Sequence, residues 1–481
     1  MLFNSFEFLV FLPIVFLLYW FVFRERKWQN LLVVVASYVF YGWWDWRFLL
    51  LIAFTSLCSF TSGLLIERYD GRRRWQQAVS AGNIVLNIGI LGIFKYYNFF
   101  VENLERLFSS TLGYHFDWVT MDIILPVGIS FYTFQALSYS IDVYQRKLPA
   151  THDIVEFFAY ISFFPQLVAG PIERATNLLP QFQLQRQFDY AKAVDGCRQM
   201  LWGFFKKLVI ADNCAAIVNE FWGQYQHLPG IGLFMIGVLF TFQIYCDFSG
   251  YSDIAIGCAR LFGFNLMRNF NYPYFSRSIP EFWRRWHISL TTWFRDYIYF
   301  PLGGSRCDKW KIIRNVYIVW AISGLWHGAS WHFVYWGLYH ATLLAIYNIL
   351  GINTKYKNVV AYGRYLPTFK EALQMILTFV LAVIGWIIFR AESMSQALHY
   401  LYCMLVKHPL IASQNMFVLS VIRWGLLFLL VEWLQRDKQH ALLFLEKHTL
   451  STRWIVYLSL YTAVAYFFLT SVKSEFIYFQ F

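Results

Sequence analysis

Charged residues are scarce in this chain. Only 14% of its 481 residues are Asp, Glu, Lys or Arg, against about 25% in an ordinary soluble domain. Prolines and glycines number only 12 and 27, and no Pro/Gly/Ser-rich linker divides the chain. A soluble protein this apolar would expose large hydrophobic patches and aggregate. The shortage of charge therefore excludes an ordinary soluble protein and predicts an integral membrane protein.

Cysteine motifs and common enzyme motifs are absent as well. No CxxC or paired spacing links the seven cysteines, which read as small buried hydrophobes, so we predict no disulfide and no zinc site. There is no Walker loop, no GxGxxG and no GxSxG. His327 and His332 are five residues apart, on different faces of a helix, and no HExxH occurs. We therefore predict no metal ligands.

Hydrophobic and aromatic residues are abundant. They make up 58% and 21% of the chain, and the mean hydropathy is +0.44. Since a span needs about 20 apolar residues, we predict an all-α polytopic membrane protein with about 11–13 membrane elements. The first is expected to be a retained span and not a signal peptide. The predicted segments are Phe6–Phe23, Leu31–Trp44, Phe48–Ile66, Ala78–Phe100, Ile123–Tyr144, Ile154–Val168, Met200–Trp222, Ile231–Phe248, Ile312–Trp326, Trp331–Leu350, Leu373–Phe389, Phe417–Leu434 and Trp454–Val472.

The net charge of +12 comes from basic residues in short loops between apolar runs. This distribution argues against a nucleic-acid partner and fits the positive-inside bias of a bacterial inner-membrane protein. Arg24, Arg26 and Lys27 close the first span, and a second basic group, Arg68 to Arg74, closes the third. We expect both loops in the cytoplasm and the N-terminus outside. No internal repeat is found, which leaves an inverted-repeat transporter without support.

Two histidines, His287 and His327, lie in apolar, tryptophan-rich stretches. A histidine at membrane depth is costly unless it faces protein, water or a substrate, so each is a candidate site residue. A neutral His327 among Trp326, Trp331 and Trp336 could act as a general base on a hydroxyl that attacks an activated carbonyl. Its neighbours Gly324 and Gly328 would let a substrate approach the backbone. The alternative is a core histidine hydrogen-bonded between helices.

The block Asn269–Gly304 mixes charges and prolines with aromatics. We expect a short helix there that lines a water-filled cavity, with Trp283 and His287 on one face; an amphipathic interfacial helix without a catalytic role is the alternative. Asp247 and Ser249 lie in a polar phrase within a span. They could orient the histidines, but pairing across helices is the favoured interpretation.

Several phrases resemble the membrane-bound O-acyltransferase (MBOAT) family, in its bacterial branch of alginate O-acetylation and teichoic-acid D-alanylation proteins. They are LPVGISFYTFQALSYSIDVYQRK (Leu125–Lys147), FFPQLVAGPIER (Phe163–Arg174), FQIYCDFSGYSDIAIG (Phe242–Gly257), WRRWHISLTTWFRDYIYFPLGGSR (Trp283–Arg306), SGLWHGASWHFVYWGLYH (Ser323–His340) and the closing SEFIYFQF. The alginate-like wording of the first phrase favours an acetyl group. Fold-level kinship alone does not fix the substrate.

The resemblance implies a ring of tilted helices around a central tunnel, in one integral-membrane domain over 1–481. We divide this domain into N-terminal spans (1–120), a catalytic core with both histidine motifs (121–350) and C-terminal spans (351–481). His327 maps onto the family's catalytic histidine and His287 onto its second histidine. Weaker substrate-binding or donor-binding candidates are Trp283, Arg284, Arg285, Arg295, Trp326, Asp247 and Ser249; Lys206 and Lys207 are further basic candidates for the donor's phosphates.

The resemblance further implies transfer of acetyl from cytoplasmic acetyl-CoA toward an exported polysaccharide, with no bound cofactor. We expect a periplasmic or membrane-anchored acetyltransferase of the SGNH-hydrolase type as a partner. The alternatives are D-alanyl transfer from a carrier protein to teichoic acid and, in another class, a proton-coupled transporter of a polar solute.

Overall fold

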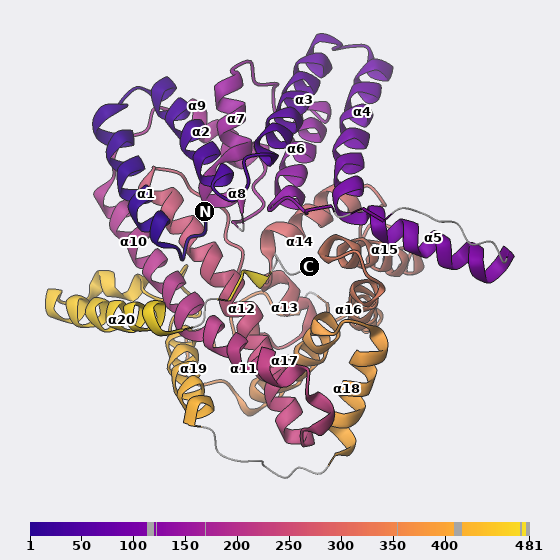
Figure 1. Ribbon diagram of the computed structural model, residues 1–481, viewed down its shortest axis with the longest axis vertical. Coiled ribbons are helices and arrows are strands. Elements are labelled where there is room, and N and C mark those ends of the chain that lie inside the picture. The colour runs from indigo at the N-terminus through magenta and orange to yellow at the C-terminus, as the bar shows by residue number, and fades with distance from the viewer. Residues whose placement is uncertain are drawn as a thin grey trace. The chain divides into compact units, whose positions relative to one another are not determined.

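The computed structural model consists of α-helices, short π- and 3₁₀-helical turns and connecting loops (Figure 1). It describes residues 1–112, 120–121, 123–168, 170–353, 355–407, 416–471 and 474–477, and no β-strand occurs in these ranges. The prediction of an all-α fold is therefore confirmed. The end of the closing phrase, 478–481, lies outside the described residues.

The chain divides into two compact units. Unit 1 comprises Met1–Ala193, Ala259–Met267 and Gly328–Ser330, and unit 2 comprises Val194–Cys258, Arg268–His327 and Trp331–Phe481. This division rests on contacts within each unit, so the predicted single domain and its three parts stay predictions. Both candidate histidines, His287 and His327, belong to unit 2.

Unit 1 holds the first nine α-helices. They are α1 (Phe6–Leu17), α2 (Arg26–Gly42), α3 (Phe48–Arg68), α4 (Arg73–Leu91), α5 (Tyr97–Leu112), α6 (Ile129–Tyr144), α7 (Ile154–Ser162), α8 (Phe164–Leu167) and α9 (Ala175–Gln183), with π-helical turns η1 (Leu18–Val22) and η2 (Gly92–Tyr96). Polar side chains start some of these helices, because the first turn leaves backbone N–H groups unpaired. The Asp153 carboxylate, for example, accepts from the N–H groups of Val155 and Glu156.

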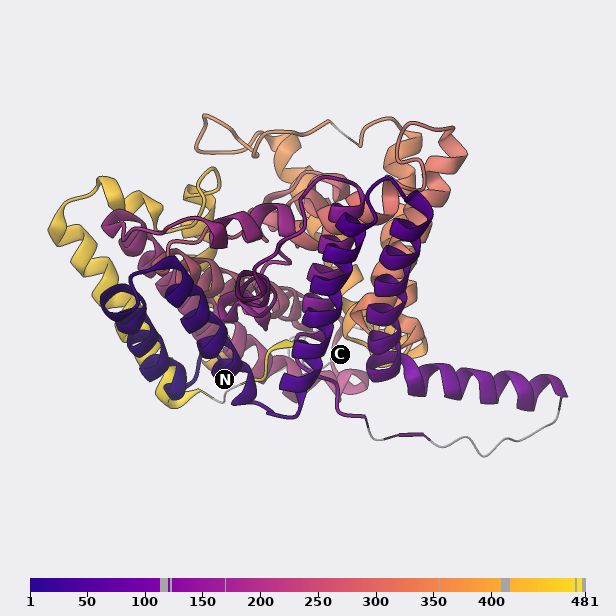
Figure 2. The same ribbon diagram turned by 90° about the horizontal axis from the view of Figure 1, so that it is seen from above.

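Small and hydroxyl side chains let α3, α4 and α6 pack closely, as is common between membrane helices. The hydroxyl of Ser59 donates to Asn83 on α4 (3.2 Å), and the hydroxyl of Ser62 donates to Ser140 on α6 (3.3 Å). Figure 2 shows α3 and α4 running side by side, and α5 leaving α4 at a steep angle after η2.

Unit 2 holds most of α10 (Tyr190–Phe204) and α12 (Gly230–Leu261), which contribute a few residues to unit 1. Its other elements are η3 (Phe205–Ala211), α11 (Asp212–Trp222), η4 (Tyr225–His227), η5 (Pro273–Phe275), α13 (Ile279–Arg285), α14 (Ile288–Phe294), η6 (Arg295–Tyr299), α15 (Lys309–His327), α16 (Trp331–Ile349), α17 (Phe369–Arg390), α18 (Met394–Val406), α19 (Met416–Leu434), η7 (Leu443–Lys447) and α20 (Leu450–Thr470). α15 and α16 form a closely packed hairpin, and α17 packs on α16.

The chain is a multi-pass membrane protein. By length and composition, the membrane-spanning candidates among the described helices are Phe48–Arg68, Arg73–Thr111, Gly230–Leu261, Phe369–Arg390 and Leu450–Thr470, with the shorter apolar helices Phe6–Val22 and Ile154–Leu167. Many of their apolar side chains face outward: α20 has no buried residue at all. Side chains of this kind are stable only against lipid or another apolar partner.

Two predicted segments illustrate how bounds differ in the structure, and one helix lies outside the predicted segments. The helix expected over Ile123–Tyr144 begins only at Ile129, after Pro126, because proline and its preceding residue disfavour helical backbone. The helix expected to end at Phe248 continues to Leu261, because the polar phrase around Asp247 is paired inside the protein. Helix α18 was not among the predicted segments, since its 13 residues are too few for a span.

Two glycines bring the backbones of α15 and α16 together. A Cβ on Gly324 would collide with the carbonyl oxygen of Phe333, and a Cβ on Gly337 with that of Trp320. The expectation that Gly324 leaves room for a substrate is therefore wrong, because the backbone of α16 occupies the space beside this glycine. The hairpin owes its close approach to these two positions.

We expect Gly337→Ala to lower the free energy of unfolding by about 1–3 kcal/mol, because overpacking a tight contact forces the backbones apart. Thermal unfolding of the purified protein would measure this loss. The matched control is Gly89→Ala in α4, where an added Cβ meets nothing within 4 Å. Equal stability of the two variants would contradict the role given to Gly337.

Candidate functional site

His327 is the last residue of α15, where its side chain is buried among aromatic rings. Its ring centroid lies 4.8 Å from that of Trp326, 4.9 Å from that of Trp336 on α16 and 5.3 Å from that of Phe389 on α17. All three rings stand nearly perpendicular to the imidazole. Trp331, which the sequence also placed around His327, is 51% exposed. Trp326 and Trp336 thus enclose His327 as predicted, together with Phe389, which was not predicted, whereas Trp331 is half exposed.

His287 lies between two short helices. Helix α13 ends at Arg285, and His287 precedes α14 with a left-handed backbone, φ +43°. The prediction that Trp283 and His287 share one helix face is therefore wrong, because the helix breaks between them. Backbone hydrogen bonds from Asn271 to Arg285 and from Ile288 to Asn269, both 2.9 Å, replace the helical ones at the break.

The His287 side chain is 1% exposed and packs edge-on against Phe248 of α12, with ring centroids 4.6 Å apart. This histidine lies outside the candidate spans, and its burial lowers its pKa to about 3. Since desolvation disfavours the charged ring, His287 is neutral at pH 7. It can donate or accept a hydrogen bond without carrying a charge.

A single indole lies beside both histidines. The Trp326 ring centroid is 6.0 Å from that of His287 and 4.8 Å from that of His327. The structure therefore brings together three of the predicted residues, His287, Trp326 and His327, within unit 2. Two imidazoles beside one indole give a compact apolar site with proton-accepting groups.

Trp283 lies deeper in the same aromatic cluster and is held by a different histidine. Its indole N–H donates to Nδ1 of His340 (3.2 Å), and its ring packs against Trp320 at 4.4 Å. His340 itself is 1% exposed. Trp283 thus acts as a structural neighbour of the histidine site and does not share the face of His287.

The three predicted arginines are already engaged by protein groups. Arg284 is exposed and donates to the carbonyls of Asn353 and Tyr356. Arg285 is buried against Glu281 (3.0 Å), and Arg295 pairs with its neighbour Asp296 (2.7 Å). Tethering loops and balancing buried charge account for these contacts, so none of the three stands out as a phosphate ligand.

Asp247 is committed to a buried ion cluster. Its carboxylate lies 2.8 Å from the ammonium of Lys207, which also contacts Asp212 at 2.8 Å, and it accepts from the N–H of Ile477 (2.7 Å). Lys206 pairs with Asp253 in the same way (2.6 Å). The favoured interpretation, pairing across helices, matches this geometry for Asp247. The hydroxyl of Ser249 is buried and has no hydrogen-bond partner among the residues that the structure describes.

Asn269 supports His287 and was not singled out from the sequence. Its amide donates to Ser252 of α12 (3.1 Å), and its side-chain oxygen accepts from the Ser289 hydroxyl (2.6 Å). Its backbone carbonyl accepts from Ile288, the residue after His287. The importance of Asn269 depends on its burial and on the break in the helix, and neither of these is visible in the sequence.

We expect Asn269→Ala to lower the melting temperature and the activity together, because it removes the side-chain bonds that fix the segment after His287. The loss of stability should be about 1–3 kcal/mol, the cost of unsatisfied buried partners. The matched control is Asn315→Ala, which also removes a buried amide, one that donates to the carbonyl of Leu302 (3.1 Å). Both variants should unfold earlier, but only Asn269→Ala should lose activity in the folded fraction; equal activity per folded molecule would refute a positioning role.

Comparison with known proteins identifies a matching family and several relatives. The sequence profile described as MBOAT, membrane-bound O-acyltransferase family, matches residues 37–358. A probable alginate O-acetylase AlgI of Pseudomonas aeruginosa is 43% identical over 399 residues, covering 82% of this chain and 73% of the relative. The counterpart from Azotobacter vinelandii is 42% identical, with 82% of this chain and 76% of the relative covered.

Two further relatives differ in the group or polymer that their names give. A peptidoglycan O-acetyltransferase of Helicobacter pylori is 32% identical, covering 83% of this chain and 79% of the relative. A teichoic acid D-alanyltransferase of Bacillus subtilis is 28% identical, covering 70% of this chain and 85% of the relative. Both histidine motifs lie inside the matched range 37–358.

Proposed function

Because this chain belongs to the membrane-bound O-acyltransferase family, we propose that it moves acetyl from cytoplasmic acetyl-CoA across the bacterial inner membrane for O-acetylation of an exported or cell-wall polysaccharide. The chain is a membrane-bound O-acyltransferase. We propose the identity of its donor, the direction of transfer and its acceptor. The observation that carries it is the pair of imidazoles beside Trp326 in unit 2.

The chemistry needs a proton acceptor and no metal. Neutral His327 would take the proton of an attacking hydroxyl as the new C–O bond forms at the thioester carbonyl. As the C–S bond breaks, the imidazolium would return this proton to the departing thiolate. Trp326 and Trp336, whose rings stand nearly perpendicular to the imidazole, would hold it in position. His287 would polarise or bind the acyl group on the donor side.

The nature of the donor rests on similarity. The relatives named as O-acetylases or O-acetyltransferases are 32–43% identical to this chain, whereas the D-alanyltransferase is 28% identical. Acetyl is therefore preferred to D-alanyl. The basic residues that close the first and third spans support cytoplasmic loops and an N-terminus outside, by the positive-inside rule. A donor taken from the cytoplasm is part of the proposal.

Labelled donors test this proposal. Membranes that contain the protein should release label from acetyl-CoA into acceptor polymer, and a D-alanyl carrier protein should give no transfer. Membranes with His327→Gln provide the blank. Transfer from the alanyl carrier alone would overturn the acetyl assignment and favour the D-alanyl alternative.

We also propose a partner that completes the transfer. Among the described residues, loops and short helices connect the candidate spans, and this arrangement supports a separate protein that binds the polymer. A periplasmic or membrane-anchored SGNH-type acetyltransferase would receive the acetyl group and place it on the polysaccharide. If the purified chain alone acetylates the polysaccharide at the rate seen in intact membranes, this part of the proposal fails.

A further inference from the structure

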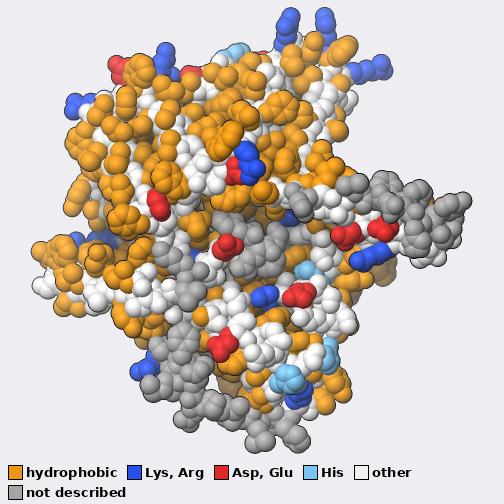
Figure 3. Space-filling view, in the orientation of Figure 1, with side chains coloured by type: hydrophobic (Ala, Val, Ile, Leu, Met, Phe, Trp, Pro, Cys, Tyr) orange, Lys and Arg blue, Asp and Glu red, His pale blue; other side chains and the backbone are white. Residues whose placement is uncertain are grey.

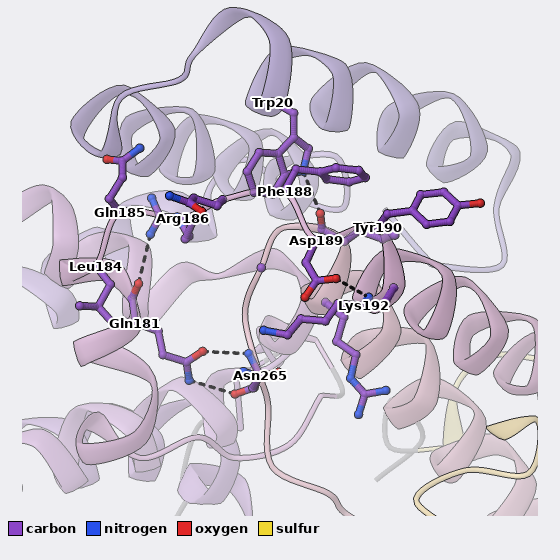
Figure 4. A pocket seen from close by; sticks show the side chains of 15 residues that line it. Trp20, Gln181, Leu184, Gln185, Arg186, Phe188, Asp189, Tyr190, Lys192 and Asn265 are labelled. Carbon is purple, nitrogen blue, oxygen red and sulfur yellow. Dashed lines mark hydrogen bonds between the residues drawn. The ribbon is translucent and has the colours of Figure 1, made fainter. Parts of the chain in front are cut away.

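Unit 1 contains a pocket of about 900 Å³ (Figure 4). Its lining residues do not include His287 or His327. Its walls come from the end of η1, the loop after α9, the start of α10 and the end of α12. Gln181 and Asn265 form one wall together: the backbone N–H of Asn265 donates to the Gln181 side chain (2.8 Å), whose amide donates back to the Asn265 carbonyl (3.0 Å). This part of the lining is therefore held by two reciprocal hydrogen bonds.

Positive charge dominates the lining. Arg186, Lys192 and Arg260 face it with one carboxylate, Asp189. Figure 4 shows the Lys192 side chain extending toward the middle of the pocket, with Arg186 on the opposite wall. The ammonium of Lys192 has no hydrogen-bond or ion-pair partner among the described residues. A group with several anionic oxygens would satisfy it.

The guanidinium of Arg186 adds a third positive charge to the lining and is held in place by polar groups of the protein. It bonds to the side-chain oxygens of Gln29 and Asn30, and it lies 4.9 Å from the ring centroid of Phe264. The Glu156 carboxylate interacts with Arg186 electrostatically without forming a direct ion pair. The positive charge of Arg186 therefore adds to that of Lys192 and Arg260 and would attract an anion in the pocket.

The position of the pocket along α1 points to the membrane surface. Side chains such as Ile14, Leu17 and Phe21 are more than half exposed, and Figure 3 shows hydrophobic side chains covering this part of the face. Trp20, a pocket residue whose indole donates to the carbonyl of Leu261 (2.9 Å), lies near the end of this apolar stripe. Arg24 comes four residues later in the chain. Tryptophan and then basic residues at the end of an apolar helix mark the headgroup level of a bilayer.

The rim beside the charges is apolar and exposed. Leu184, Phe188 and Tyr190 are 64%, 49% and 75% exposed, and Phe188 packs against Trp20 with centroids 5.4 Å apart. A soluble anion would gain nothing from contact with this apolar rim. A lipid could place its phosphate among the cationic side chains and its acyl chains along α1. Basic pockets between membrane helices are known to take anionic headgroups.

We propose that this pocket binds the phosphodiester headgroup of an anionic phospholipid. Lys192 and Arg260 contact the phosphate, and the positive charge of Arg186 attracts it without direct contact. The acyl chains lie against the exposed apolar side chains of α1. The inference does not depend on the proposed acyl transfer, since every lining residue belongs to unit 1 and neither histidine does.

Thermal unfolding of the full chain in detergent tests the proposal, with phosphatidylglycerol, phosphatidylcholine of the same acyl chains, or inorganic phosphate added. Phosphatidylglycerol should raise the melting temperature of the native sequence more than phosphatidylcholine, because a ligand stabilises the state that binds it. Lys192→Gln with Arg260→Gln should weaken the apparent affinity for phosphatidylglycerol about 30-fold, since each basic residue near an anionic surface contributes about fivefold.

The matched control is Arg24→Gln with Lys27→Gln, which removes the same amount of charge where η1 leads into α2, outside the pocket. It should keep the response to phosphatidylglycerol. Equal loss in both double variants would overturn the proposal in favour of general surface charge. Equal stabilisation by phosphatidylcholine would overturn it too, as would a full shift with inorganic phosphate alone, which identifies a soluble anion as the occupant. Activity is not measured, so this test and that of the proposed function fail independently.

Discussion

Replacing His327 by Gln abolishes acyl transfer while the protein stays folded in the membrane: this is the largest effect we expect. Glutamine fills similar space and can hydrogen-bond, but it cannot accept a proton from an attacking hydroxyl. General base catalysis contributes roughly 10²–10⁴-fold, so the residual rate should fall by at least about 100-fold. Transfer of labelled acetyl, normalised to the amount of protein in the membrane, measures it.

The control for His327 is an exposed histidine of unit 2 that lies outside the aromatic site. His399 on α18 is hydrogen-bonded to the hydroxyl of Tyr225 (3.0 Å) and has no part in the proposed chemistry. His399→Gln should retain activity within a few fold. An active His327→Gln variant would remove the general-base role, and equal losses in both variants would show that the loss at position 327 is not specific to this site.

The second large effect concerns His287, where the backbone and the imidazole are separable. The left-handed backbone at this position, φ +43°, is accessible to Gly and Asn, whereas Ala there costs about 1–2 kcal/mol. We expect His287→Gly, His287→Asn and His287→Ala all to lose activity by about 100-fold or more. Only His287→Ala should also lower the melting temperature relative to the other two.

This series distinguishes a chemical role from a structural one. If Gly and Asn restore turnover while Ala does not, the left-handed turn is what matters at position 287 and the imidazole is dispensable. Transfer of labelled acetyl and thermal unfolding, measured on the same three preparations, give both readings at once.

The helical elements were largely predictable, because long apolar runs have few alternatives in lipid. Predicted bounds such as Leu373–Phe389 fall within a helix of the structure, Phe369–Arg390, which starts with a capping box of Thr368 and Glu371. Helix ends were less predictable. The pattern of apolar residues does not show that Asp247 pairs with Lys207, 40 residues earlier in the chain. It therefore could not predict that α12 continues past Asp247.

The candidate site was predictable as a pair of histidine motifs but not as a geometry. The break before His287 arises from hydrogen bonds to the segment around Asn269, which no local pattern encodes. Phe248 and Phe389 complete the surroundings of the two histidines from α12 and α17, and each comes from a distant part of the sequence. Contacts of this kind follow from tertiary packing, so residue spacing could not reveal them.

The glycine contacts between α15 and α16 have a mechanical consequence. Backbones that touch directly leave no side-chain rotamers to rearrange, so the hairpin is expected to move as a rigid body that carries His327 and Trp336 together. Any opening that admits an acyl group to the imidazole must then come from the third wall, where Phe389 stands on α17. In hydrogen exchange, amides of the hairpin should be the slowest in this region, and those near Phe389 should exchange first.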